Sequence, residues 1–230
     1  AVGDPGREGV GHLSGWPAVV GLFLGSLVLY CVNLGQPVEN PDEFYHILAA
    51  RGLLETGEPR IADGLYWRSY LFTRLVAASF WLLGDGLVAA RLPSVIATST
   101  LVVVLFLWVR REAGAGAAWL AAGLYAVSPF AVEIAQFCRF YALQALAVVG
   151  TAWLVLELVG RPARPRVQVA RLVGAGGLAA FAVSLQPTSL MGLAGLAAWA
   201  VPALALRLLG RTDLPRRVRL GRLAAAALLA

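Results

Sequence analysis

Long apolar stretches, separated by short segments that carry arginine, constrain this chain more than any other feature of its sequence. A helix needs about 17–25 predominantly apolar residues to cross a bilayer. Six stretches meet this requirement, at residues 16–34, 91–109, 114–131, 140–159, 171–187 and 190–209, and a seventh begins near Leu223. Only 14% of the residues are charged, against about a quarter in a soluble domain. The sequence therefore predicts an all-α, polytopic membrane protein built as a bundle of transmembrane helices.

We treat residues 1–230 as one transmembrane domain, because no internal repeat, linker or low-complexity tract divides them. The chain starts without methionine and stops within the apolar run GRLAAAALLA, which is too short to cross a bilayer. We therefore expect a fragment with about six complete spans and the start of a seventh, with further spans missing on the C-terminal side.

A shorter apolar run at residues 69–83 is interrupted by Arg74. Its length is typical of an interfacial or re-entrant helix. Membrane proteins concentrate basic residues in their cytoplasmic loops. If 69–83 does not cross the membrane, one side receives most of the loop arginines, namely Arg7, Arg110, Arg111, Arg161, Arg164, Arg166, Arg171 and those from Arg207 to Arg222. If it does cross, the rule fails at each short loop, so we predict that it lies along the surface.

This arrangement predicts a multi-pass protein of the plasma membrane, which in a bacterium is the inner membrane, with a cytoplasmic N-terminus. Residues 35–90 then form the first extracytoplasmic loop, with two interfacial helices at 41–56 and 69–83. The formal net charge of +6 reflects loop arginines. No basic cluster is interleaved with aromatic residues, so nucleic acid is not an expected partner.

Two adjacent acids, Asp42 and Glu43, open the first of these helices, in PDEFYHILAARGLLETG. Asn40 and Pro41 suit the start of a helix, and acids in the first turn favour its dipole, so the pair could serve only to begin the helix. Alternatively, a carboxylate at the lipid–water boundary can remove a proton from a hydroxyl or hold a divalent cation. His46 shares a helix face with Asp42, although a metal site needs further ligands.

The second outer loop ends with a group of polar residues, Glu133, Gln136 and Arg139, followed by Tyr141. Arg139 and Tyr141 have a structural interpretation as a snorkelling arginine beside an interfacial aromatic residue. However, Arg139 is the only basic residue of its loop, on the side that the charge rule disfavours. A guanidinium at this boundary suits a lipid phosphate. Arg91, at the outer start of RLPSVIATST, has the same two interpretations.

Four stretches resemble the N-terminal half of GT-C glycosyltransferases, specifically the bacterial relatives of the protein O-mannosyltransferases, the group that includes the lipid A aminoarabinose transferase. In order, they are PDEFYHILAARGLLETG, LLGDGLVAARLPSVIATSTLVVVLFLW, YAVSPFAVEIAQFCRFYALQALAVV and SLQPTSLMGLAGLAAW. The topology that the arginines predict is similar to the layout of that family, with a long first outer loop and an acidic motif just after the first span.

The resemblance implies a membrane glycosyltransferase that moves a sugar from a polyprenyl-phosphate-linked donor to a hydroxyl of a protein, lipid or glycan acceptor on the extracytoplasmic face. Asp42, which matches the first-loop acid of the family, would be the catalytic base, and Glu43 would orient the acceptor or that base. Arg139 would contact the donor phosphate, and Arg91 is a second candidate for this contact. The isoprenoid tail would lie in a groove between spans. Further candidate substrate-binding residues are His46, Tyr141, Glu133 and Gln136.

One segment departs from the family. Many relatives carry a His-Pro-Pro-Leu-type segment before the interfacial helix, where this chain has DGLYWRSYLFTR. Tyr66, Trp67 and Arg68 take that place, which puts in doubt any role of the family's histidine. Some relatives bind a divalent metal and others do not, so the resemblance leaves a metal cofactor open.

Two other functions stay open. A multispan transporter subunit would carry polar or ionisable groups near the membrane midplane, whereas the charges of this chain gather in outer loops and at span ends. A catalytically inactive relative could serve as a scaffold in a membrane complex; the presence of Asp42 and Arg139 favours an enzyme.

Overall fold

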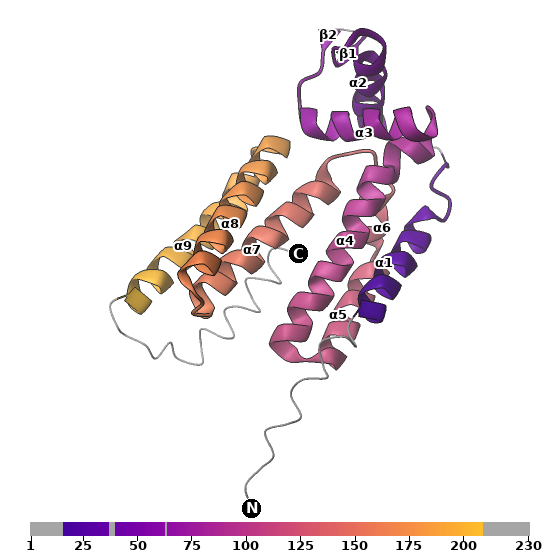
Figure 1. Ribbon diagram of the computed structural model, residues 1–230. Coiled ribbons are helices and arrows are strands. Elements are labelled where there is room, and N and C mark those ends of the chain that lie inside the picture. Colours follow the sequence, from indigo (N-terminus) through magenta and orange to yellow (C-terminus); the bar gives the residue numbers. More distant parts are fainter. Residues whose placement is uncertain (1–15, 37–39, 63, 209–230) are drawn as a thin grey trace, which may run out of the picture.

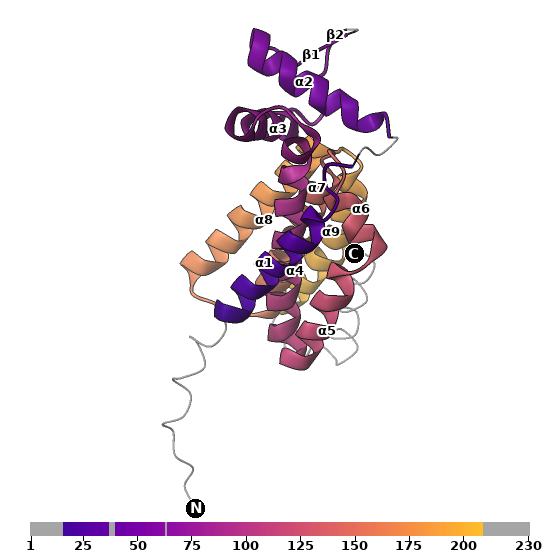
Figure 2. The same cartoon turned by 90° about the vertical axis from the view of Figure 1, so that its right-hand side faces the viewer.

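The computed structural model describes residues 16–36, 40–62 and 64–208. Its elements are α1 (Trp16–Cys31), α2 (Asp42–Thr56), β1 (Arg60–Ile61), β2 (Gly64–Leu65), α3 (Tyr70–Leu83), α4 (Leu87–Ala113), α5 (Ala115–Ala126), α6 (Pro129–Ala135), α7 (Tyr141–Gly160), α8 (Pro165–Leu185) and α9 (Ser189–Leu208). Helices α1 and α4 to α9 form a bundle, and α2 and α3 lie across one of its ends (Figures 1 and 2). The predicted all-α class is confirmed, with one addition, because β1 and β2 pair as a short antiparallel ribbon.

Four helices of the described chain are long and apolar enough to cross a membrane: α4, α7, α8 and α9. Helices α5 and α6 would together make a fifth, broken span, since they are bent by 60° at the break between them. The first predicted span is covered by α1, which has 16 residues. The predicted seventh span, near Leu223, lies outside the described residues. The count of six spans therefore stays a prediction.

The break between α5 and α6 has a local cause in the sequence. The Ser128 side chain accepts the Ala131 N–H, and Pro129 occupies the first turn of α6. Serine at the N-cap and proline just after it both favour the start of a new helix. Chain direction therefore changes at Ser128, and α6 leads into the turn that carries Arg139.

Helices α7 and α8 pack at close range because each presents a glycine to the other. A Cβ atom at Gly150 would lie 2.9 Å from Leu178 Cδ1, and one at Gly174 would lie 3.1 Å from Leu154 Cδ1. Small residues allow such approach between membrane helices. Only 11% of the apolar window of α8 is buried within the protein, as expected of a helix whose outer face meets lipid.

Helix α3 corresponds to the short apolar run of the sequence and lies across the end of the bundle (Figure 1). One face, with Phe72, Val76 and Phe80, is buried against the protein, while Trp81 near its C-terminus is 76% exposed. An apolar helix with an exposed tryptophan that lies across helix ends fits an interfacial position.

Two serine hydroxyls connect α3 to the bundle. Ser69 Oγ donates to the carbonyl of Leu185, at the end of α8, and Ser79 Oγ donates to the carbonyl of Ala89 in α4, at 2.6 Å. Pro93 explains the second bond: proline has no N–H, so the Ala89 carbonyl, four residues earlier, lacks its donor within the helix. Ser79 supplies a donor in its place.

A buried ion pair connects α2 to α4. Arg91 Nε and Nη2 donate to the two carboxylate oxygens of Glu43, at 2.9 and 2.7 Å. Both side chains are enclosed, with exposed fractions of 1% and 3%. Arg91 Nη1 donates to the carbonyls of Leu34 and Gln36, at 2.7 Å each. The same guanidinium therefore joins α2 to the segment that follows α1. Its paired hydrogen bonds to the Glu43 carboxylate fix the relative orientation of the two side chains as well as their distance.

We expect Arg91→Met to lower the free energy of unfolding by about 3–5 kcal/mol, because it leaves the Glu43 carboxylate buried without its cation. The double variant Arg91→Met/Glu43→Gln should recover most of this loss, since the buried charge is then removed. Thermal unfolding of the purified protein in detergent measures both. Equal destabilisation in the single and the double variant would contradict this account of the pair.

Candidate active site

The structure brings together two residues that the sequence analysis singled out, Asp42 and Arg139. Asp42 is the first residue of α2, and its N–H donates to Oδ1 of Asn40, at 3.1 Å. Arg139 lies in the turn between α6 and α7. Arg139 Nη2 donates to Asp42 Oδ2 at 2.6 Å. The arginine side chain is only 5% exposed, whereas that of Asp42 is 48% exposed, so the carboxylate is open to a ligand from outside.

Aromatic rings surround the guanidinium of Arg139. Its Cζ lies 5.5 Å from the centroid of the Phe140 ring and 5.8 Å from that of Tyr141, close enough for cation–π attraction. Nη1 donates to the hydroxyl of Tyr66 at 3.4 Å. Nε is buried and has no hydrogen-bond partner among the described residues. The cation is therefore held in one orientation by its neighbours.

Arg68 is a site residue to which the sequence analysis assigned no role. Its Cζ lies 5.7 Å from the centroid of the Phe140 ring, the ring that also receives Arg139. Arg68 Nη2 donates to the amide oxygen of Gln186 at 3.0 Å. Arg68 is exposed and has no carboxylate within 4 Å in the described part of the chain. The site therefore contains two arginines and a single exposed carboxylate, that of Asp42, which pairs with Arg139 alone, so positive charge is in excess.

His46 lies behind this site and is completely buried. Its Nδ1 is hydrogen-bonded to Thr73 Oγ1 at 2.9 Å, and its ring meets those of Tyr66, Phe72 and Phe140 edge-on. Burial, together with the positive charges of Arg139 and Arg68, lowers the pKa of His46 to about 3, so the imidazole is neutral at physiological pH. The prediction that His46 binds substrate does not fit this enclosure; it packs α2 against α3.

Glu43 and Arg91 also differ from expectation, because the structure encloses both. Their polar atoms bind each other and backbone groups, which removes Glu43 from contact with an acceptor and Arg91 from contact with a donor phosphate. Glu43 Oε1 additionally accepts the N–H of Cys138, at 2.7 Å. Ser94, one turn after Arg91, donates to the carbonyls of Phe137 and Arg139, at 2.8 and 3.1 Å. Together these groups hold the turn from which Arg139 extends.

The Gln136 side chain binds the C-terminal end of helix α1, whereas the sequence analysis expected it to bind substrate. Its Nε2 donates to the carbonyls of Tyr30 and Val32, at 3.1 and 2.7 Å, which are near the C-terminal end of α1. The expected substrate contact of Gln136 is therefore replaced by a structural bond. Carbonyls in the last turn of a helix lack partners within the helix, so an amide side chain is a suitable donor.

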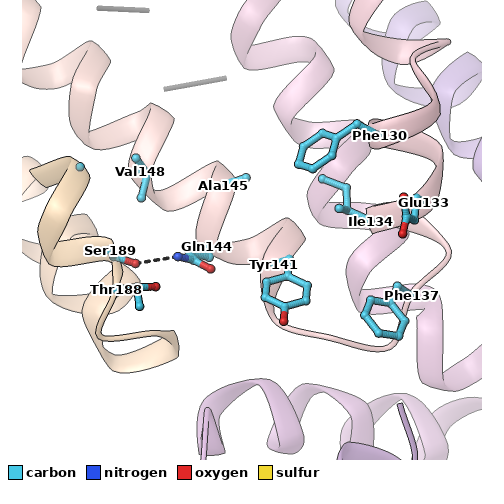
Figure 3. Close-up of a pocket in the computed structure, with 11 residues that line it drawn as sticks. Phe130, Glu133, Ile134, Phe137, Tyr141, Gln144, Ala145, Val148, Thr188 and Ser189 are labelled. Carbon is cyan, nitrogen blue, oxygen red and sulfur yellow. Dashed lines mark hydrogen bonds between the residues drawn. The ribbon is translucent and has the colours of Figure 1, made fainter. Parts of the chain in front are cut away.

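Glu133 and Tyr141, by contrast, line a cavity of about 510 Å³ between α6, α7 and the start of α9 (Figure 3). A cavity of this size suits a small organic ligand or part of a lipid. Apolar and aromatic side chains form most of its wall: Phe130, Ile134, Phe137, Ala145 and Val148. Polar groups of Gln144, Thr188 and Ser189 lie along one side, and Gln144 Nε2 donates to Ser189 Oγ at 2.9 Å. Tyr141 belongs to both the cavity and the surroundings of Arg139, so the two regions adjoin.

A search of the described residues found no three histidine, cysteine, aspartate or glutamate side chains placed to hold a metal ion. His46 in particular has Thr73 on one nitrogen and aromatic rings around it. The site thus consists of two arginines, one open carboxylate and an apolar cavity beside them.

Comparison with known proteins gave a family match and a structural match. A family model described as dolichyl-phosphate-mannose-protein mannosyltransferase matches residues 68–228, a range that includes Arg68 and Arg139 and begins after Asp42. Curated protein sequences gave no match. The crystal structure of ArnT from Cupriavidus metallidurans in the apo state is similar in fold, with a TM-score of 0.66 at 20% sequence identity.

That similarity covers 95% of this chain and 40% of the ArnT chain, so the chain spans less than half the length of the protein that it resembles. The family match extends over more than half of this chain, and the apolar helices fit a multi-pass membrane protein. On these grounds the chain belongs to the dolichyl-phosphate-mannose-protein mannosyltransferase family and shares the GT-C fold of a polytopic membrane protein.

Proposed function

We propose that the protein is a membrane glycosyltransferase that moves a sugar from a polyprenyl-phosphate-linked donor to an acceptor hydroxyl. One observation carries the proposal: the half-exposed carboxylate of Asp42 lies 2.6 Å from the buried guanidinium of Arg139, and the aromatic surroundings of that guanidinium continue into an apolar cavity. A base, a phosphate-binding cation and a place for a lipid chain are the groups that this reaction needs.

In the proposed reaction Asp42 is the catalytic base. An acceptor hydroxyl oxygen attacks the anomeric carbon of the sugar as its proton passes to the Asp42 carboxylate. The bond between that carbon and the phosphate oxygen breaks, and its electron pair stays on the departing lipid phosphate. Attack opposite to the leaving group inverts the anomeric configuration. A positioned carboxylate suits this proton transfer.

Arg139 and Arg68 bind the phosphate in this scheme. Negative charge develops on the phosphate oxygen as the sugar leaves, and preorganised cations at that position stabilise the transition state. Arg139 is held in place by Asp42, Tyr66 and two aromatic rings. Arg68 contributes a second positive charge that no carboxylate of the described residues neutralises.

The isoprenoid chain of the donor occupies the cavity between α6, α7 and α9. Its wall is largely apolar, and Tyr141 lies at the border with the phosphate-binding residues. Glu133, in the same wall, is placed to accept hydrogen bonds from sugar hydroxyls.

We further propose that residues 1–230 form one transmembrane domain in the plasma membrane, the inner membrane in a bacterium, with a cytoplasmic N-terminus. Asp42 and Arg139 then face the extracytoplasmic side. The distribution of arginines supports this orientation, because Arg110, Arg111 and the Arg161–Arg171 segment lie at the end of the bundle opposite α2 and α3 (Figure 1). Basic residues favour the cytoplasmic side.

Asp42→Asn should reduce kcat by roughly 10²–10⁴-fold, because the amide cannot accept the hydroxyl proton. The measurement is release of lipid phosphate by the full-length enzyme from a panel of polyprenyl-phosphate sugars with candidate acceptors. Asp85→Asn, an exposed aspartate paired with Arg51, is the matched control and should keep full activity. Unchanged turnover in Asp42→Asn would remove this residue from the mechanism.

Arg139→Ala is expected to lower kcat by roughly 10²–10³-fold, since the developing phosphate charge loses a fixed donor. Arg68→Ala should instead raise the KM for the donor by roughly tenfold, because this exposed cation contributes one charged hydrogen bond. Steady-state kinetics with the donor varied separate the two effects. Wild-type donor kinetics in both variants would contradict the assigned phosphate site.

Cysteine labelling tests the orientation in a Cys31→Ala background, in which the other cysteine of the chain, Cys138, is buried. A membrane-impermeant maleimide added to intact cells should label Glu58→Cys. Arg164→Cys should react only after the cells are permeabilised. The reverse pattern would show that the arginine-rich end faces outside and would exclude an extracytoplasmic active site.

A further inference from the structure

The end of the bundle opposite α2 and α3 has a concentration of charge that the proposed sugar transfer does not use. The α4–α5 and α7–α8 connections lie at this end (Figure 1). Six arginines and two glutamates gather there, which we call the arginine end: Arg110, Arg111, Arg161, Arg164, Arg166, Arg171, Glu112 and Glu157. Positive charge is therefore in large excess.

Glu157 organises the centre of the arginine end. It is 5% exposed, and its carboxylate accepts a hydrogen bond from Arg171 at 3.0 Å and forms ion pairs with Arg111 at 2.9 Å and with Arg161 at 3.6 Å. Arg161 also pairs with Glu112, at 2.9 Å. One buried carboxylate thus forms ion pairs with guanidinium groups from α4, from the α7–α8 connection and from α8. Its single negative charge cannot neutralise three positive charges.

Arg171 has a structural task in addition. Its Nη1 donates to the carbonyls of Glu157 and Arg161, at 3.1 and 3.0 Å. The Arg161 carbonyl directly follows α7, where helical donors are absent, and the Glu157 carbonyl, in the last turn of α7, also accepts the Arg161 N–H at 3.1 Å. Arg171 therefore fixes the first turns of α8 against the end of α7, and it is not free to bind a further anion.

Arg164 and Arg166 have no such partner. Both are exposed, at the N-cap and in the first turn of α8. In the described ranges, no carboxylate lies within 4 Å of either guanidinium. The amino end of a helix carries partial positive charge, which adds to their own. Two unpaired cations are thus displayed beside a network that already holds more arginines than acids.

We propose that the arginine end binds the phosphate groups of anionic phospholipids, with Arg164 and Arg166 as the binding residues. Three helices that meet there, α4, α7 and α8, are long and apolar enough to cross a membrane, so their ends lie at the level of the lipid headgroups. Arginine binds phosphate oxygens through paired N–H groups. Free phosphate has the same chemistry, but a headgroup is already concentrated at this depth, and basic residues next to membrane helices attract anionic lipids.

The test is the affinity of the full-length protein in detergent for phosphatidylglycerol, titrated by native mass spectrometry. Arg164→Gln/Arg166→Gln should bind this lipid roughly 25-fold more weakly, at roughly fivefold for each arginine. Both side chains are exposed and without an ion pair, so the variant should unfold at the wild-type temperature. Phosphatidylcholine, which has no net charge, should bind more weakly than phosphatidylglycerol to the wild-type protein and equally to both proteins.

The matched control, Arg60→Gln/Arg74→Gln, removes the same charge from exposed residues at the opposite end and should keep the wild-type affinity. Equal loss in the two double variants, or no loss in Arg164→Gln/Arg166→Gln, would overturn the proposal. Complete displacement of phosphatidylglycerol by millimolar inorganic phosphate would also overturn it, because the ligand would then be a free anion. None of these results depends on whether the protein transfers a sugar.

Discussion

The position of the candidate active site depends on the buried carboxylate of Glu43. Three N–H groups donate to it, two from Arg91 and one from the backbone of Cys138. Glu43 and Cys138 are sequence neighbours of the Asp42–Arg139 pair, since Asp42 comes directly before Glu43 and Arg139 directly after Cys138. The inner contact therefore brings the outer ion pair into register. A buried carboxylate without its donors would be strongly unfavourable, so these contacts form together.

Burial divides neighbouring charged residues into two groups with different tasks. Glu43 and Arg91 are enclosed and hold segments together, whereas Asp42 and Arg68 meet the outside. Arg139 has features of both groups: its side chain is buried, but its guanidinium pairs with the half-exposed carboxylate of Asp42. The neutral imidazole of His46 adds no charge to this arrangement. The chemistry open to a ligand is thus that of one carboxylate and two cations.

Much of the fold was predictable because its signals are local. Apolar length and helix-starting residues predicted helices at 41–56 and 69–83, and the structure has them at Asp42–Thr56 and Tyr70–Leu83. The placement of arginines predicted that the second helix lies along the membrane surface, and in the structure this helix lies across the end of the bundle. Among the site residues, Asp42 and Arg139 were identified as candidates because each is a charged residue of an outer loop at the membrane boundary.

The errors share one cause, which is that a sequence does not show whether a polar side chain meets a ligand or a distant part of its own chain. Glu43 and Arg91 are 48 positions apart, and Gln136 binds carbonyls more than 100 positions earlier. Such pairs become visible only in three dimensions. Arg68 was left without a role because the segment around it departs from the family, and its proximity to Phe140 is again a property of the fold.

The attachment of α3 to the bundle has a consequence for the motion of the helices. The hydrogen bonds of its two serines reach α8 and α4, so helix α3 bridges those two helices at this end of the bundle. If α4 and α8 move apart at that end, α3 must move with one of them and one of the two serine hydrogen bonds must break.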